Sequence, residues 1–147
     1  MTRQRFSLRS CDWRVTVFYE ATANDAEDIR CALVDAGCSD AYLANAIEKI
    51  NGGGLNCGLT YTNIGKGMSV VVIGETSSAD EFANTYAHEQ GHLVRHISQA
   101  IGLEPHGETE QYIAGEINQQ MFAVAKKYLC EHCRSAKSTF YKSFGLD

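Results

Sequence analysis

Two histidines and a glutamate share one short stretch of the chain, in the order His88, Glu89 and His92. On a helix, His88 and His92 lie on one face with their Cβ atoms about 5–6 Å apart. At this spacing each imidazole can give one ring nitrogen to the same Zn²⁺ ion. Glu89 then lies beside the metal, where its carboxylate can take a proton from a metal-bound water and leave a hydroxide that attacks a carbonyl. The three residues therefore predict metal-assisted hydrolysis.

The neighbouring sequence favours the helix that this chemistry needs. Ser78 precedes Asp80 and Glu81, which is typical of a helix start with acidic residues in the first turn. Apolar residues then recur at helical spacing, namely Phe82, Tyr86, Leu93 and Ile97. The helix is expected to run to about Ala100, with the histidines near its middle. The alternative is a surface helix that carries two histidines by chance.

A catalytic zinc site normally has three protein ligands and a water. The candidates for the third ligand are His96, His106, Glu108, Glu110 and Glu116. His96 is disfavoured because it lies eight residues, or roughly 12 Å of helix rise, from His88. A second helix expected from residue 107 supplies carboxylates after a short turn, and Glu108 is the first choice, with Glu110 second. The alternative for these carboxylates is an ordinary place in the first turn of that helix.

The chain resembles the small phage- and prophage-encoded metallopeptidases of the gluzincin type. The resemblance lies in His88-Glu89-Gln90-Gly91-His92 and in residues 102–115, and it covers about the C-terminal half of the chain. It implies a zinc-dependent peptidase in which His88, His92 and Glu108 hold the metal and Glu89 is the general base. It also implies that residues 55–63 form a strand that binds an extended peptide or protein substrate by edge addition.

Two more catalytic residues follow from the resemblance. Tyr112 lies one helical turn after Glu108 and is expected to direct its hydroxyl at the oxyanion that forms during attack. His106 is the second candidate for this role. The alternatives are a tyrosine buried in the core and a histidine that simply occupies the turn.

Hydrophobic periodicity predicts the remaining elements. These are strands over residues 11–19, 55–63 and 68–74, helices over residues 25–35, 39–50 and 107–129, and a hairpin turn around residues 65–67. The apolar run of residues 70–73 predicts that its strand is central. Residues 1–147 are therefore expected to form one α+β domain with a small, mostly antiparallel sheet packed with helices. We expect a zincin-like arrangement, with the HExxH stretch on a central helix and the zinc site between two helices.

Composition places the chain among ordinary globular domains. Its 147 residues carry a net charge of -5, with 44% hydrophobic and 21% charged residues, which argues against general nucleic-acid binding. No apolar run is long enough to cross a bilayer, and residues 1–5 lead into no apolar signal core. We therefore expect a cytoplasmic protein with no membrane partner.

The cysteines are expected to be reduced in a cytoplasmic protein. There are six of them, and most are interpreted as small buried hydrophobes. Cys130 and Cys133 flank Glu131 and His132 with the spacing of half a structural zinc site, but no partner pair lies nearby. Ordinary thiols on a terminal helix are the favoured interpretation of this pair.

Two functions without hydrolysis are the alternatives to a peptidase. In the first, the domain is a regulatory or interaction module in which zinc fixes the helices and the cleft holds a partner protein. In the second, it is a phage structural or host-takeover protein whose metal site is degenerate.

Overall fold

The computed structural model describes residues 1–52 and 58–135. Within these residues, four strands form one sheet in the order β1-β2-β4-β3. The strands are β1 (Thr2–Ser7), β2 (Arg14–Ala21), β3 (Leu59–Asn63) and β4 (Met68–Gly74). The helices are a 3-10 turn η1 (Ala23–Asp25), α1 (Ala26–Asp35), α2 (Asp40–Asn51), α3 (Ala79–Ala100) and α4 (Glu108–Ala125). The expected α+β class is confirmed.

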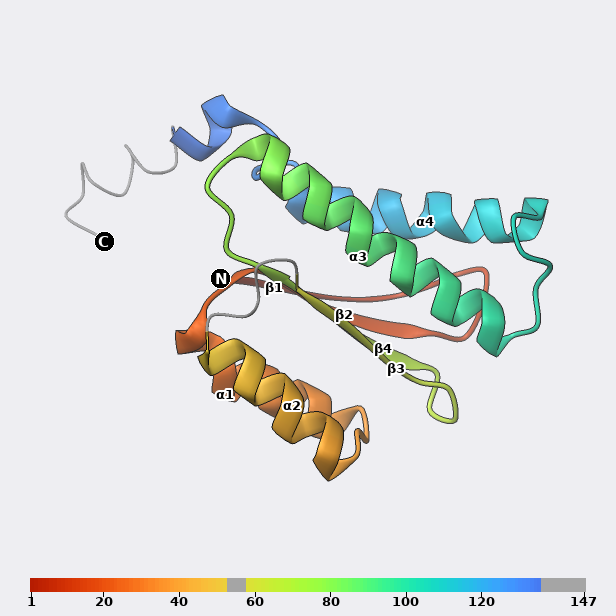
Figure 1. Cartoon of the computed structure of the whole chain (residues 1–147). Coiled ribbons are helices and arrows are strands. Elements are labelled where there is room, and N and C mark those ends of the chain that lie inside the picture. The colour runs from red at the N-terminus through yellow and green to blue at the C-terminus, as the bar shows by residue number, and fades with distance from the viewer. Residues whose placement is uncertain (53–57, 136–147) are drawn as a thin grey trace.

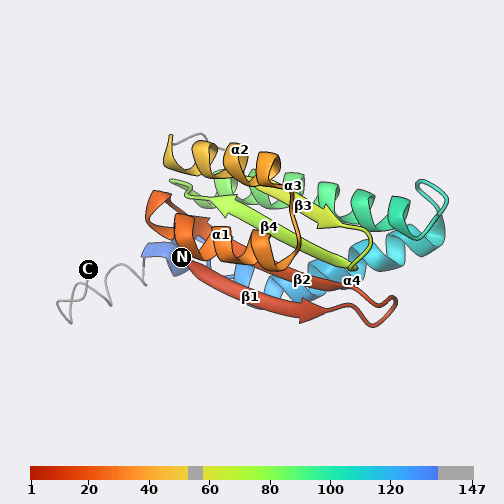
Figure 2. The same ribbon diagram turned by 90° about the horizontal axis from the view of Figure 1, so that it is seen from below.

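The sheet is mixed and lies between two pairs of helices. Strands β1 and β2 are antiparallel, as are β3 and β4, whereas β2 and β4 are parallel. Helices α1 and α2 cover one face, and α3 and α4 cover the other (Figures 1 and 2). The parallel pair arises because α1, α2 and β3 intervene between β2 and β4 in the chain. Two of the three strand pairings therefore agree with the expected antiparallel sheet.

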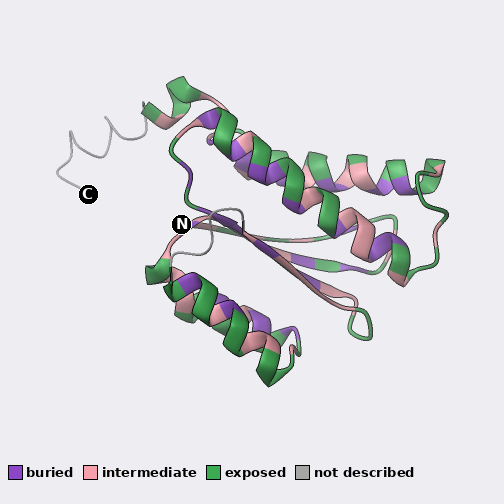
Figure 3. Ribbon diagram, in the orientation of Figure 1, coloured by how far each residue is buried: buried purple, intermediate pink, exposed green. Residues whose placement is uncertain are grey.

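The two central strands contribute to both hydrophobic cores. Val17 and Val71 belong to the core beneath α3 and α4, and Phe18 and Val72 belong to the core beneath α1 and α2. All four side chains are fully buried, and Figure 3 shows this buried layer between the helix pairs. Residues 70–73 were expected to lie in a central strand, and their burial on both faces confirms this.

Strand β1 was not predicted from the sequence. Its burial alternates between half-buried and exposed, and Arg3 and Arg5 occupy exposed positions. Phe6 is the one large apolar residue that packs on the core from this strand. The sequence of this edge strand has too little apolar periodicity to predict a strand. Its hydrogen bonds to β2, and not burial in the core, hold it in the sheet.

The helix that carries the histidines begins and ends close to the predicted positions. The Ser78 side chain accepts a hydrogen bond from the backbone N–H of Glu81 and caps α3. The buried face of α3 includes Phe82, Leu93 and Ile97, which pack on the sheet. Helix α4 ends at Ala125, before the predicted end at residue 129. Of the strand predicted over residues 55–63, residues 55–57 lie outside the described part, and β3 begins at Leu59.

None of the helices within the described residues is long and apolar enough to span a membrane.

Candidate metal centre

Helix α3 presents His88 and His92 on consecutive turns. Both side chains are exposed, and their Nε2 atoms lie 3.1 Å apart. Two nitrogens that bind one tetrahedral zinc at 2.0–2.1 Å stand about 3.3 Å from each other. The histidine pair therefore fits two corners of such a site without rearrangement of the rings.

The pair lies on the side of α3 that is turned away from α4. The Gln90 side chain donates a hydrogen bond to Asn118 of α4 at 3.1 Å. His88 and His92 each lie two residues from Gln90, which is about 200° around a helix. The structure therefore does not place the histidines between the two helices, where the sequence predicted a zinc site.

Glu89 points in a different direction from the histidines, toward strand β3. Its side chain is 3% exposed, and its Oε2 accepts a hydrogen bond of 2.5 Å from the hydroxyl of Thr60. Thr60 lies on β3, which forms one edge of the four-stranded sheet. The carboxylate is therefore held between the histidine helix and an edge strand.

His96 anchors the next turn of α3 to the same strand. Its Nδ1 lies 2.9 Å from the hydroxyl of Thr62, which in turn lies 2.8 Å from the hydroxyl of Ser69. Burial lowers the pKa of His96, and the nearby His92 lowers it further. The lowered pKa favours the neutral imidazole, and His96 is held against β3 by its contact with Thr62.

A hollow of about 280 Å³ adjoins this strip of β3. Thr60 and Thr62 line it from the strand, His96 lines it from α3, and Tyr42 lines it from α2. Glu89 does not line this hollow, but Thr60 belongs to its wall and also binds the Glu89 carboxylate. Thr60 therefore links the hollow to the candidate base.

The carboxylates at the start of α4 lie near the other end of α3. Glu110 accepts a 2.5 Å hydrogen bond from Ser98 and a 3.3 Å hydrogen bond from the backbone N–H of His106. Ser98 is six residues, or about 9 Å of helix rise, beyond His92. Glu108 is exposed and precedes Glu110 on a helix that runs back along α3. Neither carboxylate reaches the histidine pair.

The other predicted site residues also lie apart from the histidines. Tyr112 is 70% exposed on α4, so it is not a core residue. His106 is exposed in the turn before α4 with φ of 63°. Glu116 accepts hydrogen bonds from the backbone N–H groups of Arg9 and Ser10 and from the Ser10 hydroxyl. Its carboxylate is therefore occupied by the loop between β1 and β2.

The histidine pair therefore supplies two of the three protein ligands that a catalytic zinc site needs, and no third ligand lies beside it among the described residues. Across residues 1–52 and 58–135, no three His, Cys, Asp or Glu side chains form a group that could hold a metal ion. The imidazole pair fits zinc, and the described residues do not complete its ligand set.

Sequence reasoning missed Thr60 and Thr62, which hold Glu89 and His96. The available signal was the alternation of Thr60 and Thr62 with Tyr61 in a strand expected to lie next to the helix. This alternation places both hydroxyls on one face, but it does not say which helix covers that face.

No family model, curated protein or solved structure matches this chain. The resemblance to gluzincin-type peptidases therefore rests on the residues of the two motifs alone.

Proposed function

We propose that this chain is a zinc-dependent peptidase in which His88 and His92 hold the metal and Glu89 is the general base. The observation that carries the proposal is the 3.1 Å approach of the two Nε2 atoms on an exposed helix face. The two imidazoles are within hydrogen-bonding distance of each other, and the same convergence brings one nitrogen of each ring close enough to bind a single ion. Glu89, between the two ligands in sequence, adds the group that hydrolysis requires.

The arrangement of the Glu89 carboxylate suits proton transfer. Thr60 fixes Oε2, whereas Oε1 makes no hydrogen bond with another described residue. Oε1 is thus the oxygen that we assign to accepting a proton and then passing it to the leaving amine. Bound zinc would supply a water of lowered pKa and polarise the carbonyl of the substrate.

The edge strand β3 supports a peptide substrate. An extended peptide can add to a sheet edge through main-chain hydrogen bonds, with its side chains in neighbouring hollows. β3 lies beside Glu89, and the hollow of about 280 Å³ lies along the same strand. A peptide paired with β3 would therefore run past the candidate base.

Glu108 is the third ligand that the resemblance implies. In the described structure it lies beyond the end of α3, so its recruitment would require the first turns of α4 to move along α3. Substitution of this residue tests that part of the proposal separately from the histidine pair.

A zinc-binding module without peptidase activity is the second candidate. The observation that favours it is the missing third ligand among the described residues. In this case zinc would fix the exposed face of α3, and the hollow beside β3 would hold a partner protein. Glu89 would then help to hold α3 against β3 through its hydrogen bond from Thr60, and it would have no catalytic role.

The Glu89→Gln variant separates the two candidates. The amide keeps the shape of the side chain and an oxygen for the Thr60 hydroxyl, but it cannot accept the proton. For the peptidase we expect hydrolysis of a peptide library to fall at least 100-fold while zinc content stays unchanged. Equal hydrolysis by wild type and variant, or loss of zinc in the variant, would contradict the role of Glu89. Glu108→Gln is the companion variant, and loss of zinc there would identify the third ligand.

A further inference from the structure

Cys130 and Cys133 form a close pair of thiols just after α4. The backbone N–H of Cys133 donates a hydrogen bond to Cys130 Sγ at 3.4 Å. Cys133 is exposed and Cys130 is half-buried. The pair is therefore open to small molecules.

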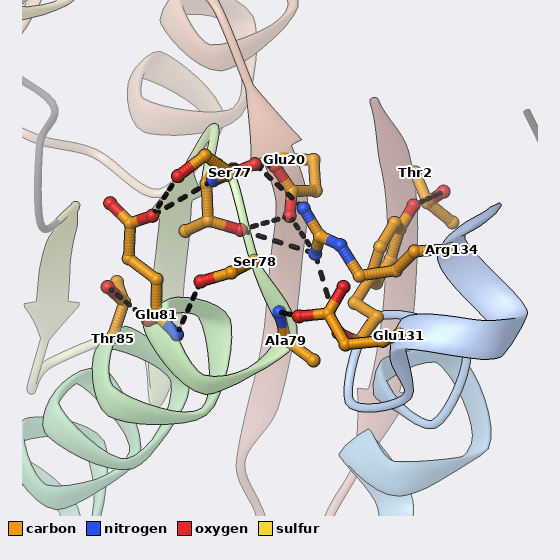
Figure 4. Close-up of polar contacts among 11 residues, drawn as sticks. Thr2, Glu20, Ser77, Ser78, Ala79, Glu81, Thr85, Glu131 and Arg134 are labelled. Carbon is orange, nitrogen blue, oxygen red and sulfur yellow. Dashed lines mark hydrogen bonds and ion pairs between the residues drawn. The ribbon is translucent and has the colours of Figure 1, made fainter.

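The segment that carries these thiols is fixed to the rest of the fold. Glu131 accepts a 2.6 Å hydrogen bond from the backbone N–H of Ala79, the first residue of α3. Arg134 forms an ion pair with Glu20 at 2.9 Å and donates to the carbonyl of Thr76 at 2.7 Å. Figure 4 shows the contacts of Glu131 with Ala79 and of Arg134 with Glu20. The two thiols therefore lie on a segment that is anchored to β2 and to the start of α3.

The two sulfurs have unequal electrostatic surroundings. The backbone N–H and the thiol of Cys133 both donate to Cys130 and lower the pKa of its thiol. The same donation raises the pKa of Cys133, because that thiol must stay protonated to make it. Cys130 is thus the thiol that ionises more readily, and Cys133 stays protonated to a higher pH.

The spacing of the two residues suits a disulfide. On a helical turn the Cα atoms of residues three apart lie about 5 Å from each other, which is within the Cα separations of about 4.4–6.8 Å that disulfides span. A structural zinc site is the competing use of such a pair, but it needs four ligands. Within the described residues, no group of three His, Cys, Asp or Glu surrounds these thiols.

We propose that Cys130 and Cys133 form a redox-active dithiol that exchanges with low-molecular-weight disulfides. The Cys130 thiolate attacks one sulfur of the small disulfide, which breaks its S–S bond, releases one thiolate and leaves a mixed disulfide on Cys130. Cys133 then loses its proton and attacks Cys130 Sγ, which releases the second small thiolate and forms the Cys130–Cys133 bond. Two protein thiols are oxidised, and one small disulfide is reduced to two thiols that take up the two protons.

The proposal does not depend on metal binding at His88 and His92. It assigns to this segment a chemistry that the proposed peptidase does not use. Its connection to α3 is structural, because Glu131 between the two cysteines holds the first residue of that helix.

The test uses the full chain in glutathione buffers, with each thiol followed by alkylation and peptide mass spectrometry. Cys31 is the matched control, because it is an exposed thiol on α1 with a hydrogen bond to Glu27. With glutathione disulfide in excess, we expect wild type to form the Cys130–Cys133 disulfide without bound glutathione. The Cys133→Ser variant should instead retain glutathione on Cys130. At pH 7, iodoacetamide should modify reduced Cys130 at least several-fold faster than Cys31.

Three results would overturn the proposal. One is the absence of the intramolecular disulfide when glutathione disulfide is in excess. Another is wild-type protein that keeps glutathione on Cys130, since Cys133 would then fail to displace it. The last is equal alkylation of Cys130 and Cys31, which would make Cys130 an ordinary exposed thiol.

Discussion

Glu89 on α3 and Glu110 on α4 are both buried glutamates, but they differ in the number of hydrogen bonds that their carboxylates accept. The Glu110 carboxylate accepts from Ser98 and from the backbone N–H of His106, and Arg95 lies 3.6 Å from it. Glu89 has only Thr60 as a hydrogen-bond donor among the described residues. Glu110 is thus satisfied as a structural anion, whereas Glu89 keeps an oxygen available for a proton.

Glu110 should make stability depend on pH in the acid range. Its hydrogen bond from Ser98, with smaller contributions from His106 and Arg95, holds its pKa below the ordinary value of 4.5. Because the folded pKa is the lower one, the ionised carboxylate stabilises the fold above the unfolded pKa. That stabilisation is lost as the pH falls through the folded pKa. We expect wild type to be more stable than Glu110→Gln at pH 7, with the difference shrinking below about pH 4.5.

Urea unfolding at several pH values measures this dependence. With all proteins kept free of metal, Glu108→Gln is the matched control, because it removes an equal charge two residues earlier and leaves the Ser98 contact in place. A pH-independent difference between wild type and Glu110→Gln would show that the Ser98 bond does not favour the ionised carboxylate.

The residue types of the candidate site could be predicted from the sequence, but their neighbours could not. The four-residue spacing of His88 and His92 defines one helix face, and the structure shows their rings together on that face. Which way this face points depends on how α3 packs against β3 and α4. The position of Glu108 depends on the same packing, because the offset between two helices is set by side-chain contacts along both. The local sequence pattern therefore predicts neither the direction of the histidine face nor the offset between α3 and α4.

At the scale of elements, a small polar cluster joins the segment after α4 to β2 and to the residues that precede α3. Glu20 occupies a left-handed conformation with φ of 55°, which is unusual for a residue with a Cβ atom. Its carboxylate accepts from the backbone N–H and the hydroxyl of Thr76 and pairs with Arg134. The strained backbone at Glu20 is therefore stabilised by contacts from two other segments.

Removal of Arg134 should destabilise the fold measurably. The Arg134 and Glu20 side chains are 18% and 13% exposed, so water only partly replaces the lost contact. Glu20 keeps its two bonds from Thr76, and we therefore expect Arg134→Met to lower the free energy of unfolding by about 1–3 kcal/mol. Guanidinium unfolding measures this change, and faster amide exchange at Ala79 would accompany it.

Arg30→Met is the control for charge removal. Arg30 pairs with Glu27 on the same helix, and both side chains are well exposed, at 44% and 71%. Exposed pairs of this kind contribute little to stability. If both variants lost the same stability, the cluster around Arg134 would have no special part in holding α3.

Elements with strong local signals were predicted closely. Ser39 caps α2, which was predicted to begin at residue 39, and Gly37, with φ of 79°, follows the end of α1. The turn at residues 64–67 closes the predicted hairpin between β3 and β4. Strand β1 was missed because its order comes from pairing with β2. The parallel pairing of β2 with β4 was also missed, because it depends on where the intervening elements pack.

At the scale of the whole molecule, a single sheet connects two hydrophobic cores. Strands β2 and β4 place alternate residues in each core, so neither core can lose its strands without exposing the other. This geometry predicts one cooperative unfolding transition for the described residues.

Leu33→Ala tests this cooperativity. Leu33 is fully buried beneath α1 and α2, whereas Trp13 is buried in the opposite core and hydrogen-bonds to Ser69. We expect the substitution to cost about 2–5 kcal/mol. Trp13 fluorescence and far-ultraviolet circular dichroism should shift to the same lower midpoint in denaturant. A Trp13 midpoint that stays at the wild-type value would show that the two cores unfold separately.

The composition and periodicity of the chain were enough to predict an α+β fold with helices packed on a small sheet. The long apolar helix faces and the run of residues 70–73 made this possible. The division of helices between two faces was not predictable, because each amphipathic helix would bury equally well on either face.

Zinc content is the most direct test of the account. Elemental analysis would be made on protein purified without added metal, for wild type, His92→Ala and His106→Asn. His106→Asn is the matched control, since asparagine tolerates the left-handed backbone at that position and His106 lies outside the pair. The account predicts about one zinc per chain in wild type and in His106→Asn, and its loss in His92→Ala. Wild-type protein without zinc, or zinc that persists in His92→Ala, would contradict the metal centre.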